Sequence, residues 1–263
     1  MRWLLFLAAT GLGFILAAVG LTLLEEGEPA ELLPDLDQAV PSSVSVVRLG
    51  DTYRLTFASA VDNVGRGPLL IEASRPDHST PTMTVRQAVR REDGSTRVRT
   101  TRDRMRYVRS ETHAHWHLLG FERYELREAA GAELVSPDRK TGFCLGDRYD
   151  TRASMRIEGE PEDAVWTEEC GRGEPALLEV REGISPGYGD DYVPELEGQH
   201  VDVTGVQAGR YVLVHRANPE RTLEESDYSN NAASVLLELR RPAGEIPTIE
   251  VLARCPQTDR CTP

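Results

Sequence analysis

Hydrophobic and polar residues alternate in short runs along most of this chain. The runs are bounded by Gly, Pro, Asp or Asn, and a period of two predicts strands with one buried and one exposed face. Asp93-Gly94 lies between two runs and predicts a hairpin turn. We therefore predict an all-β fold, a β-sandwich with long loops. The clearest runs are Ser45–Leu49, Tyr53–Ala58, Leu69–Glu72, Arg97–Thr101, Phe121–Leu126, His200–Val203, Tyr211–His215 and Ser234–Leu239.

The N-terminal segment departs from this pattern. Residues 3–24 carry no charge and predict one hydrophobic helix, close to the ~20 residues that span a bilayer. Arg2 precedes the segment and Glu25 follows it, which places the rest of the chain outside the cytoplasm. Ala18-Val-Gly20 is an acceptable cleavage site, so a retained anchor and a cleaved signal peptide both remain open. We predict a tether at residues 25–34, a main domain at 35–240 and a C-terminal tail at 241–263.

The chain has four cysteines, an even number that favours disulfides in an exported protein. Four cysteines allow three pairings. A bond between Cys255 and Cys261 would close a small loop in the tail and leave Cys144 to pair with Cys170. No C-x-x-C spacing is present, which argues against a zinc knuckle or a thioredoxin-like site.

The net charge of −13 argues against a nucleic-acid partner. One stretch has the opposite sign, because nine arginines fall between Arg86 and Arg109. Several of them alternate with other residues, which is typical of the solvent face of strands. A polyanion-binding strip is the alternative interpretation.

Three of the six histidines are spaced two residues apart, at His113, His115 and His117. Alternate side chains of a strand lie on one face, so the three imidazoles can reach a common ion. Neutral imidazole suits copper, zinc, iron and nickel. The spacing therefore predicts a metal site and leaves the metal open.

Lys140 is the single lysine among 30 lysines and arginines. Arginine stays protonated in proteins, whereas lysine can lose a proton and react as an amine nucleophile. On composition alone, codon usage that favours arginine is the better explanation. The position of Lys140 shortly after the histidines favours a chemical role.

These motifs together resemble the lysyl oxidase family. The resemblance covers roughly Leu33 to Leu239 and follows the family's order of motifs. The matching segments are His113-Ala-His115-Trp-His117, Lys140–Leu145, Ile184–Gly187 with Asp190–Tyr192, Val201–Thr204, Gly209–Tyr211, Asn218-Pro219 and Glu225–Asn231. The compact arrangement is similar to that of bacterial members.

The resemblance implies a copper site and a self-made cofactor. In the family the histidine strip binds copper, which assigns copper to His113, His115 and His117. The family's lysine tyrosylquinone joins a lysine to an oxidised tyrosine, and Lys140 and Tyr192 match those two positions. Tyr188 is the weaker alternative for the tyrosine.

The implied activity is that of a protein-lysine 6-oxidase-like amine oxidase. It would oxidise primary amines, either peptidyl lysine or small amines and diamines, to aldehydes. Molecular oxygen is the second substrate, and hydrogen peroxide and ammonia are released. Asp190 and Asp191 are candidates for the general base, because they are close to Tyr192 in the sequence.

The resemblance also implies a calcium site. An acidic loop and an N-terminal Asp-Leu pair match the calcium ligands of animal members, and oxygen ligands of this kind suit calcium. The alternative is an Asp/Asn-rich turn that caps two strands without an ion. The implied ligands are Asp35, Leu36, Glu225, Asp227, Asn230 and Asn231.

Two other functions remain open. The first is a three-histidine oxygenase or hydrolase without a quinone, in which Lys140→Arg would keep activity. The second is a non-catalytic β-sandwich at the cell surface that binds calcium. It would show no metal-dependent redox activity even when calcium binds.

Overall fold

The computed structural model describes residues 28–110, 114–130, 132–136, 141–151, 156–196 and 198–262. These ranges form seventeen strands and no helix, which confirms the predicted all-β fold. The hydrophobic helix predicted at residues 3–24 lies outside them. Within the described part of the chain, no helix is both long and apolar enough to cross a membrane.

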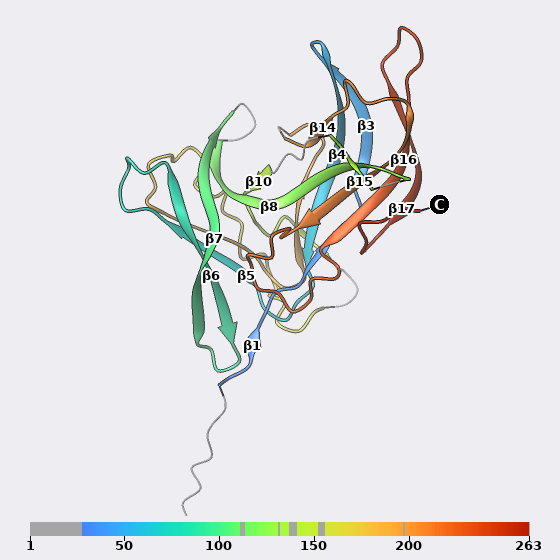
Figure 1. Ribbon diagram of the computed structural model, residues 1–263. Helices are drawn as coiled ribbons and strands as arrows, with labels where there is room; N and C mark the ends of the chain where they lie inside the picture. Colours follow the sequence, from blue (N-terminus) through green and yellow to red (C-terminus); the bar gives the residue numbers. More distant parts are fainter. Residues whose placement is uncertain are drawn as a thin grey trace, which may run out of the picture.

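The larger sheet is antiparallel, and its main path runs β12-β5-β6-β7-β8-β15-β16-β17 (Figure 1). Three short strands join it, since β1 pairs with β6 and both β9 and β10 pair with β8. The bounds are β1 Glu31–Leu32, β5 Leu69–Ser74, β6 Thr82–Arg91, β7 Thr96–Arg109, β8 Ala114–Glu128, β9 Leu134–Ser136, β10 Thr141–Phe143, β12 Glu179–Ile184, β15 Gly209–Ala217, β16 Ala232–Arg240 and β17 Thr248–Cys255.

The smaller sheet is built around the long strand β4. Its path is β11-β13-β4-β14, and β2 and β3 also pair with β4. The bounds are β2 Leu36–Gln38, β3 Ser42–Leu49, β4 Thr52–Asn63, β11 Tyr149–Asp150, β13 Tyr188–Tyr192 and β14 His200–Asp202.

Aromatic rings join the two sheets. Phe57 of β4 lies 4.9 Å from Tyr124 of β8 and 4.5 Å from His215 of β15, measured between ring centroids. All three residues are fully buried. Each large apolar side chain removed from water contributes roughly 1.5–3 kcal/mol. The core therefore lies between the sheets, as in a sandwich.

Strand β8 links the two halves of the larger sheet (Figure 1). Its first residues, Ala114–Leu118, pair with β7, and Glu122–Glu128 pair with β15. Between these stretches Gly120 has a φ of 78°, a left-handed conformation that glycine adopts without strain. An irregular residue of this kind changes which side chains of a strand face the core.

Most of the predicted strand runs lie inside observed strands, and the turn at Asp93-Gly94 connects β6 to β7 as predicted. The division into tether, main domain and tail stays a prediction. Glu31–Leu32 of the tether pair with β6, and Thr248–Cys255 of the tail pair with β16.

Candidate functional site

Two of the three predicted metal-binding histidines are described, and they lie side by side. His115 and His117 are both on β8, with centroids of the two rings 4.7 Å apart. They are 6% and 4% exposed. Paired, buried imidazoles are a donor set that suits copper. His113 lies outside the described residues, so its part in the site stays a prediction.

Tyr192 approaches this region from the other sheet. It ends β13 and pairs with Ser59 of β4. Its hydroxyl oxygen accepts a hydrogen bond of 2.9 Å from the backbone N–H of Cys144, and its ring centroid lies 4.2 Å from that of Phe143. Burial raises the pKa of Tyr192 well above its ordinary value, and the nearby Asp190 carboxyl adds to the rise. The phenol is therefore held protonated and in one orientation.

Strand β10 lies against both the histidines and Tyr192. It begins at Thr141, directly after Lys140, and Phe143 pairs with Leu118 of β8. A Cβ atom on Gly142 would lie 2.7 Å from Cβ of His117, so only glycine allows this approach. Lys140 itself lies outside the described residues. The chain that follows it is fixed beside the candidate centre.

A small pocket of about 150 Å³ lies at the candidate centre. His115 and Tyr192 both line it, so side chains from the two sheets meet there. Sequence reasoning identified Asp191 but missed Arg148, Glu169 and Arg172, because these three come from loops without a recognisable motif. The lining residues are His115, Arg148, Glu169, Arg172, Asp191, Tyr192 and Leu196.

A larger cleft of about 770 Å³ adjoins this pocket. The two share Leu196, and the cleft extends over β3 and β4. His200 is buried in its wall.

The two acidic residues before Tyr192 differ in environment. Asp191 is exposed and lines the pocket. Asp190 is fully buried, and the only ion pair recorded for it among described residues joins its Oδ1 to Nε of Arg148 at 3.5 Å. Burial raises the pKa of Asp190 well above its ordinary value. Asp191 is therefore the one of the two that can reach a molecule in the pocket.

Two further buried carboxyls lie near the centre, and sequence reasoning did not identify them. Glu122 accepts a 2.7 Å hydrogen bond from the hydroxyl of Ser59, and burial raises its pKa to about 7. Glu182 accepts a 3.2 Å bond from the N–H of Leu145, and burial raises its pKa well above the usual range. The sequence does contain one indication that Glu122 is buried. A glycine next to a strand run, here Gly120, indicates a bulge that can turn the side chain of Glu122 inward.

A disulfide between Cys144 and Cys170 fixes the chain next to Tyr192, and a second joins Cys255 to Cys261. This is one of the three pairings that the sequence allowed. Both sulfurs near Glu182 are in the disulfide, so the Cys144, Cys170 and Glu182 group is not a thiolate metal site. Disulfides persist in oxidising compartments, which agrees with an exported chain.

Tyr188, the alternative tyrosine, and the buried His215 do not line the pocket. Tyr188 begins β13, pairs with Asp150 and does not line the pocket. His215 is fully buried, and burial lowers its pKa to about 3, so it is neutral. Its packing between Phe57 and Tyr124 confirms a structural role.

The predicted calcium ligands gather at a second place, where β2 meets the 223–231 loop. Glu225 is buried and accepts bonds from the side chains of Asn218 and Asn231 and, at 2.9 Å, from the N–H of Leu36. Asn230 donates a 2.6 Å bond to Asp35. Residues nearly two hundred positions apart therefore meet as the resemblance implied.

The side-chain oxygen atoms of this second site differ in burial and in hydrogen bonding. The side-chain oxygens of Asn230 and Asn231 are buried and accept no hydrogen bond from the described residues. Asp227 is exposed and accepts bonds from the N–H and hydroxyl of Ser229. Two buried amide oxygens beside two carboxylates fit a hard cation. Leu36 is tied to this cluster through its N–H, which donates to Glu225.

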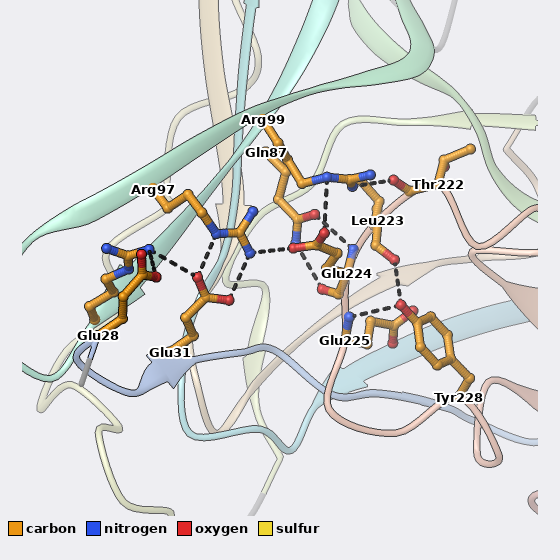
Figure 2. A network of polar contacts seen from close by, with 11 residues as sticks. Glu28, Glu31, Gln87, Arg97, Arg99, Thr222, Leu223, Glu224, Glu225 and Tyr228 are labelled. Atoms are coloured by element: carbon orange, nitrogen blue, oxygen red, sulfur yellow. Dashed lines mark hydrogen bonds and ion pairs between the residues drawn. The ribbon is translucent and has the colours of Figure 1, made fainter. Parts of the chain in front are cut away.

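A polar network holds the loop of the second site against the larger sheet (Figure 2). Gln87 of β6 exchanges two 2.8 Å bonds with the backbone of Glu224, and Arg97 and Arg99 of β7 pair with its carboxylate. Arg97 also pairs with Glu31 of β1. Glu225 is thereby positioned by its neighbour in the sequence.

Comparison with known proteins identifies the family of the chain. The family model described as lysyl oxidase matches residues 72–245. Protein-lysine 6-oxidase of Rattus norvegicus is 32% identical over 121 residues, 45% of this chain and 25% of that protein. Lysyl oxidase homolog 1 of Homo sapiens is 30% identical over 120 residues, covering 45% and 18%. Lysyl oxidase homolog 3B of Danio rerio is 31% identical over 186 residues, covering 70% and 17%. The chain thus matches a quarter or less of these relatives' lengths, and it belongs to the lysyl oxidase family.

Proposed function

We propose that this chain is a copper-dependent amine oxidase that converts primary amines to aldehydes. Oxygen is reduced to hydrogen peroxide and the amine nitrogen leaves as ammonia, so one amine, one O₂ and one water give one aldehyde, one peroxide and one ammonia. The observation that carries the proposal is the pocket where His115 of one sheet and Tyr192 of the other meet. Peptidyl lysine and small amines or diamines are the substrate classes.

His113, His115 and His117 would hold copper, and Lys140 and Tyr192 would form the lysine tyrosylquinone. The quinone supplies an electron sink for the oxidation of the amine, and copper supports its formation from the tyrosine. Family membership, the adjacent imidazoles and the oriented phenol support this assignment. The position of Thr141 beside β8 supports a role for the lysine that precedes it.

The protein's own residues have distinct parts in this proposal. The N–H of Cys144 holds the Tyr192 hydroxyl at 2.9 Å, and Phe143 packs against the ring. A general base must come within hydrogen-bond reach of the proton that it removes. Asp191 lines the pocket and takes this role, whereas the buried Asp190 contacts Arg148.

The single lysine gives a direct test of cofactor formation. The protein is expressed with and without copper under air, denatured, reduced and digested with a lysine-specific protease. Lys140 is the only cleavage site, so protein without the cross-link yields two fragments. We expect the copper-treated protein to resist cleavage and peptide mass mapping to place the cross-link at Tyr192 rather than Tyr188.

Complete cleavage of both samples, with copper bound at the histidines, would exclude the quinone. The metal-only oxygenase or hydrolase would then be the better description, and Lys140→Arg would keep its activity. Cleavage without copper binding would favour the non-catalytic surface protein.

We further propose calcium at the second site, with Asp35, Glu225, Asp227, Asn230 and Asn231 as ligands and a smaller contribution from Leu36. The buried, unbonded amide oxygens favour this over a turn without an ion. We also propose that residues 3–24 either anchor the chain in the membrane or direct its secretion. In both cases the described domain works outside the cytoplasm.

A further inference from the structure

Seven of the nine arginines between Arg86 and Arg109 fall into two groups in the structure. Arg86, Arg91, Arg97 and Arg99 form ion pairs with Glu72, Glu28, Glu31 and Glu224. Figure 2 shows Arg97 and Arg99 in their network. These arginines have a structural explanation. Arg86 links β6 to β5, and the other three hold the N-terminal residues and Glu224 against β6 and β7.

Arg102, Arg104 and Arg106 have a different environment. All three are exposed, and they alternate along β7 with the less exposed Asp103 and the buried Met105. No carboxylate of the described residues lies within 4 Å of their guanidinium groups. Arg104 donates only to backbone carbonyls, including a 2.8 Å bond to that of Asp103. We call these three residues the arginine strip.

The strip leads to the candidate centre. Arg106 is the cross-strand partner of His117, and Val108 is the partner of His115. Directly opposite residues on antiparallel strands lie on the same face, with Cβ atoms ~4.5–5.5 Å apart. The strip therefore begins one strand away from a candidate copper ligand and extends from it by about 13 Å, at ~3.3 Å per residue.

The arginine strip is positively charged, whereas the chain as a whole has a net charge of −13. Such a local field attracts anions and repels a free cationic amine. A cationic amine can still be accepted if negative charges accompany it on the same molecule. An extended polypeptide presents alternate side chains on one face at the same spacing as the strip.

We propose that the arginine strip selects primary amines carried on acidic polypeptides, with carboxylates at alternate positions of an extended substrate contacting Arg102, Arg104 and Arg106. This rests on the proposed amine oxidase function and adds the substrate class to it. The strip is a specificity determinant, and a free diamine cannot use it.

The test uses the full chain, purified in detergent and loaded with copper under air. Two acetylated 11-residue peptides contain one central lysine and, at three alternate positions on one side, either glutamate or glutamine. We measure kcat/KM by peroxide release at 50 mM and 500 mM salt. At low salt we expect about a tenfold preference for the glutamate peptide, the size expected from three exposed ion pairs. High salt should largely remove it.

The variant Arg104→Ser/Arg106→Ser should reduce this preference to less than about threefold. The matched control Arg90→Ser/Arg181→Ser removes the same charge from exposed positions elsewhere on the sheet and should keep the preference. The preference is a ratio within one protein, so a general loss of folding or cofactor cancels. A ratio near one in the parent protein, or an equal loss in the control, would overturn the proposal.

A second measurement does not depend on catalysis. Fluorescence anisotropy follows the binding of labelled versions of both peptides with leucine in place of lysine. Preferential binding of the glutamate peptide that is lost in the strip variant supports the proposal, even if no amine is oxidised and the proposed function fails. Equal binding of both peptides overturns it. Binding of dextran sulfate without binding of the acidic peptide would also overturn it and assign the strip to a polysaccharide.

Discussion

The two candidate ion sites are assembled in opposite ways. At the candidate copper site, strands from both sheets bring side chains together, and His115 and Tyr192 line a small pocket. At the candidate calcium site, a turn and strand β2 meet, and Glu225 already accepts three hydrogen bonds. The first site has room for chemistry, whereas the second is held closed by its own polar contacts.

This difference predicts whether each site contributes to activity or to stability. A pocket lined by nitrogen donors and a tyrosine serves binding and reaction, and changes there should remove activity with little effect on folding. A hydrogen-bonded cluster that joins residues far apart in the sequence serves stability. Changes there should alter unfolding more than turnover.

The largest expected effect follows from removing both described histidines. In His115→Ala/His117→Ala we expect copper affinity to fall at least about 100-fold, because loss of a group that only supports a ligand already costs ~10–100-fold. Cross-linking of Lys140 and peroxide release should then be undetectable. Metal analysis after dialysis against a weak chelator measures the first effect, and an amine oxidase assay measures the second.

His78→Ala is the matched control for this prediction, because His78 is exposed in a loop away from the pocket. It should bind copper and turn over like the parent protein. Normal copper binding by the double variant would show that β8 does not bind copper and would contradict the contrast drawn between the two sites.

The two disulfides give the next largest effect. Cys144→Ser/Cys170→Ser opens a link with a sequence separation of 26 and should cost about 3 kcal/mol of unfolding free energy. Cys255→Ser/Cys261→Ser opens a separation of 6 and should cost less, because a shorter loop restricts the unfolded chain less. Urea unfolding of the non-reduced proteins measures both.

Turnover should separate the same two variants. Loss of the first disulfide loosens the Cys144 N–H that holds Tyr192, so kcat should fall. Loss of the second should leave kcat unchanged, since the tail does not reach the pocket. Equal effects on kcat would show that the disulfide is not part of the support for Tyr192.

Glu122 sharpens the comparison, because burial raises its pKa to about 7, as it does for Glu225. Between pH 4.5 and 7 the carboxyl of the unfolded chain ionises while the folded one stays protonated, so stability falls as pH rises. Glu122→Gln has no carboxyl at this position and does not lose this stability. Its free energy of unfolding, relative to that of the parent, should therefore rise by about 3 kcal/mol between pH 4.5 and 8.

Unfolding free energies of both proteins at pH 5 and pH 8 test this prediction. The groups that face Glu122 are Ser59, Gln38, Tyr124 and Asp190. Asp190 also has a raised pKa, mainly through burial, and the charge of Glu122 adds to it, so the measured difference includes this smaller coupling. A pH-independent difference would show that Glu122 is ionised in the fold.

The sequence predicted the fold class because alternation in runs such as Tyr211–His215 reports directly which face is buried. It also predicted His115, His117 and Tyr192 as members of one site, through the order of the family's motifs. The sequence did not predict which strands pair with each other. Nothing local shows that Trp116 and Tyr107 are cross-strand partners, since register depends on contacts between distant segments.

The charged residues around the pocket were missed for the same reason. Arg148 and Arg172 come from irregular loops whose positions are set by the disulfide at Cys170 and by packing. Glu122 was missed because a carboxylate in a strand run is ordinarily assigned to the exposed face, although it is in phase with the buried Tyr124 and Leu126. The strands β1 and β17 went unpredicted, and both are short or half-exposed additions to sheet edges.

The smallest expected effect concerns calcium, and it tests whether the second site is more than a turn. Calcium at ten times its Kd should stabilise the fold by about 1.4 kcal/mol through binding to the folded state alone. Asp35→Asn should remove this gain, because it takes a charge from the cluster beside Asn230, whereas Asp51→Asn in an exposed turn should keep it. Thermal unfolding with calcium, magnesium or a chelator measures the gain. If calcium at millimolar concentration gives no gain in the parent protein, the hydrogen bonds around Glu225 are sufficient without an ion, and the histidine site is left as the candidate metal site.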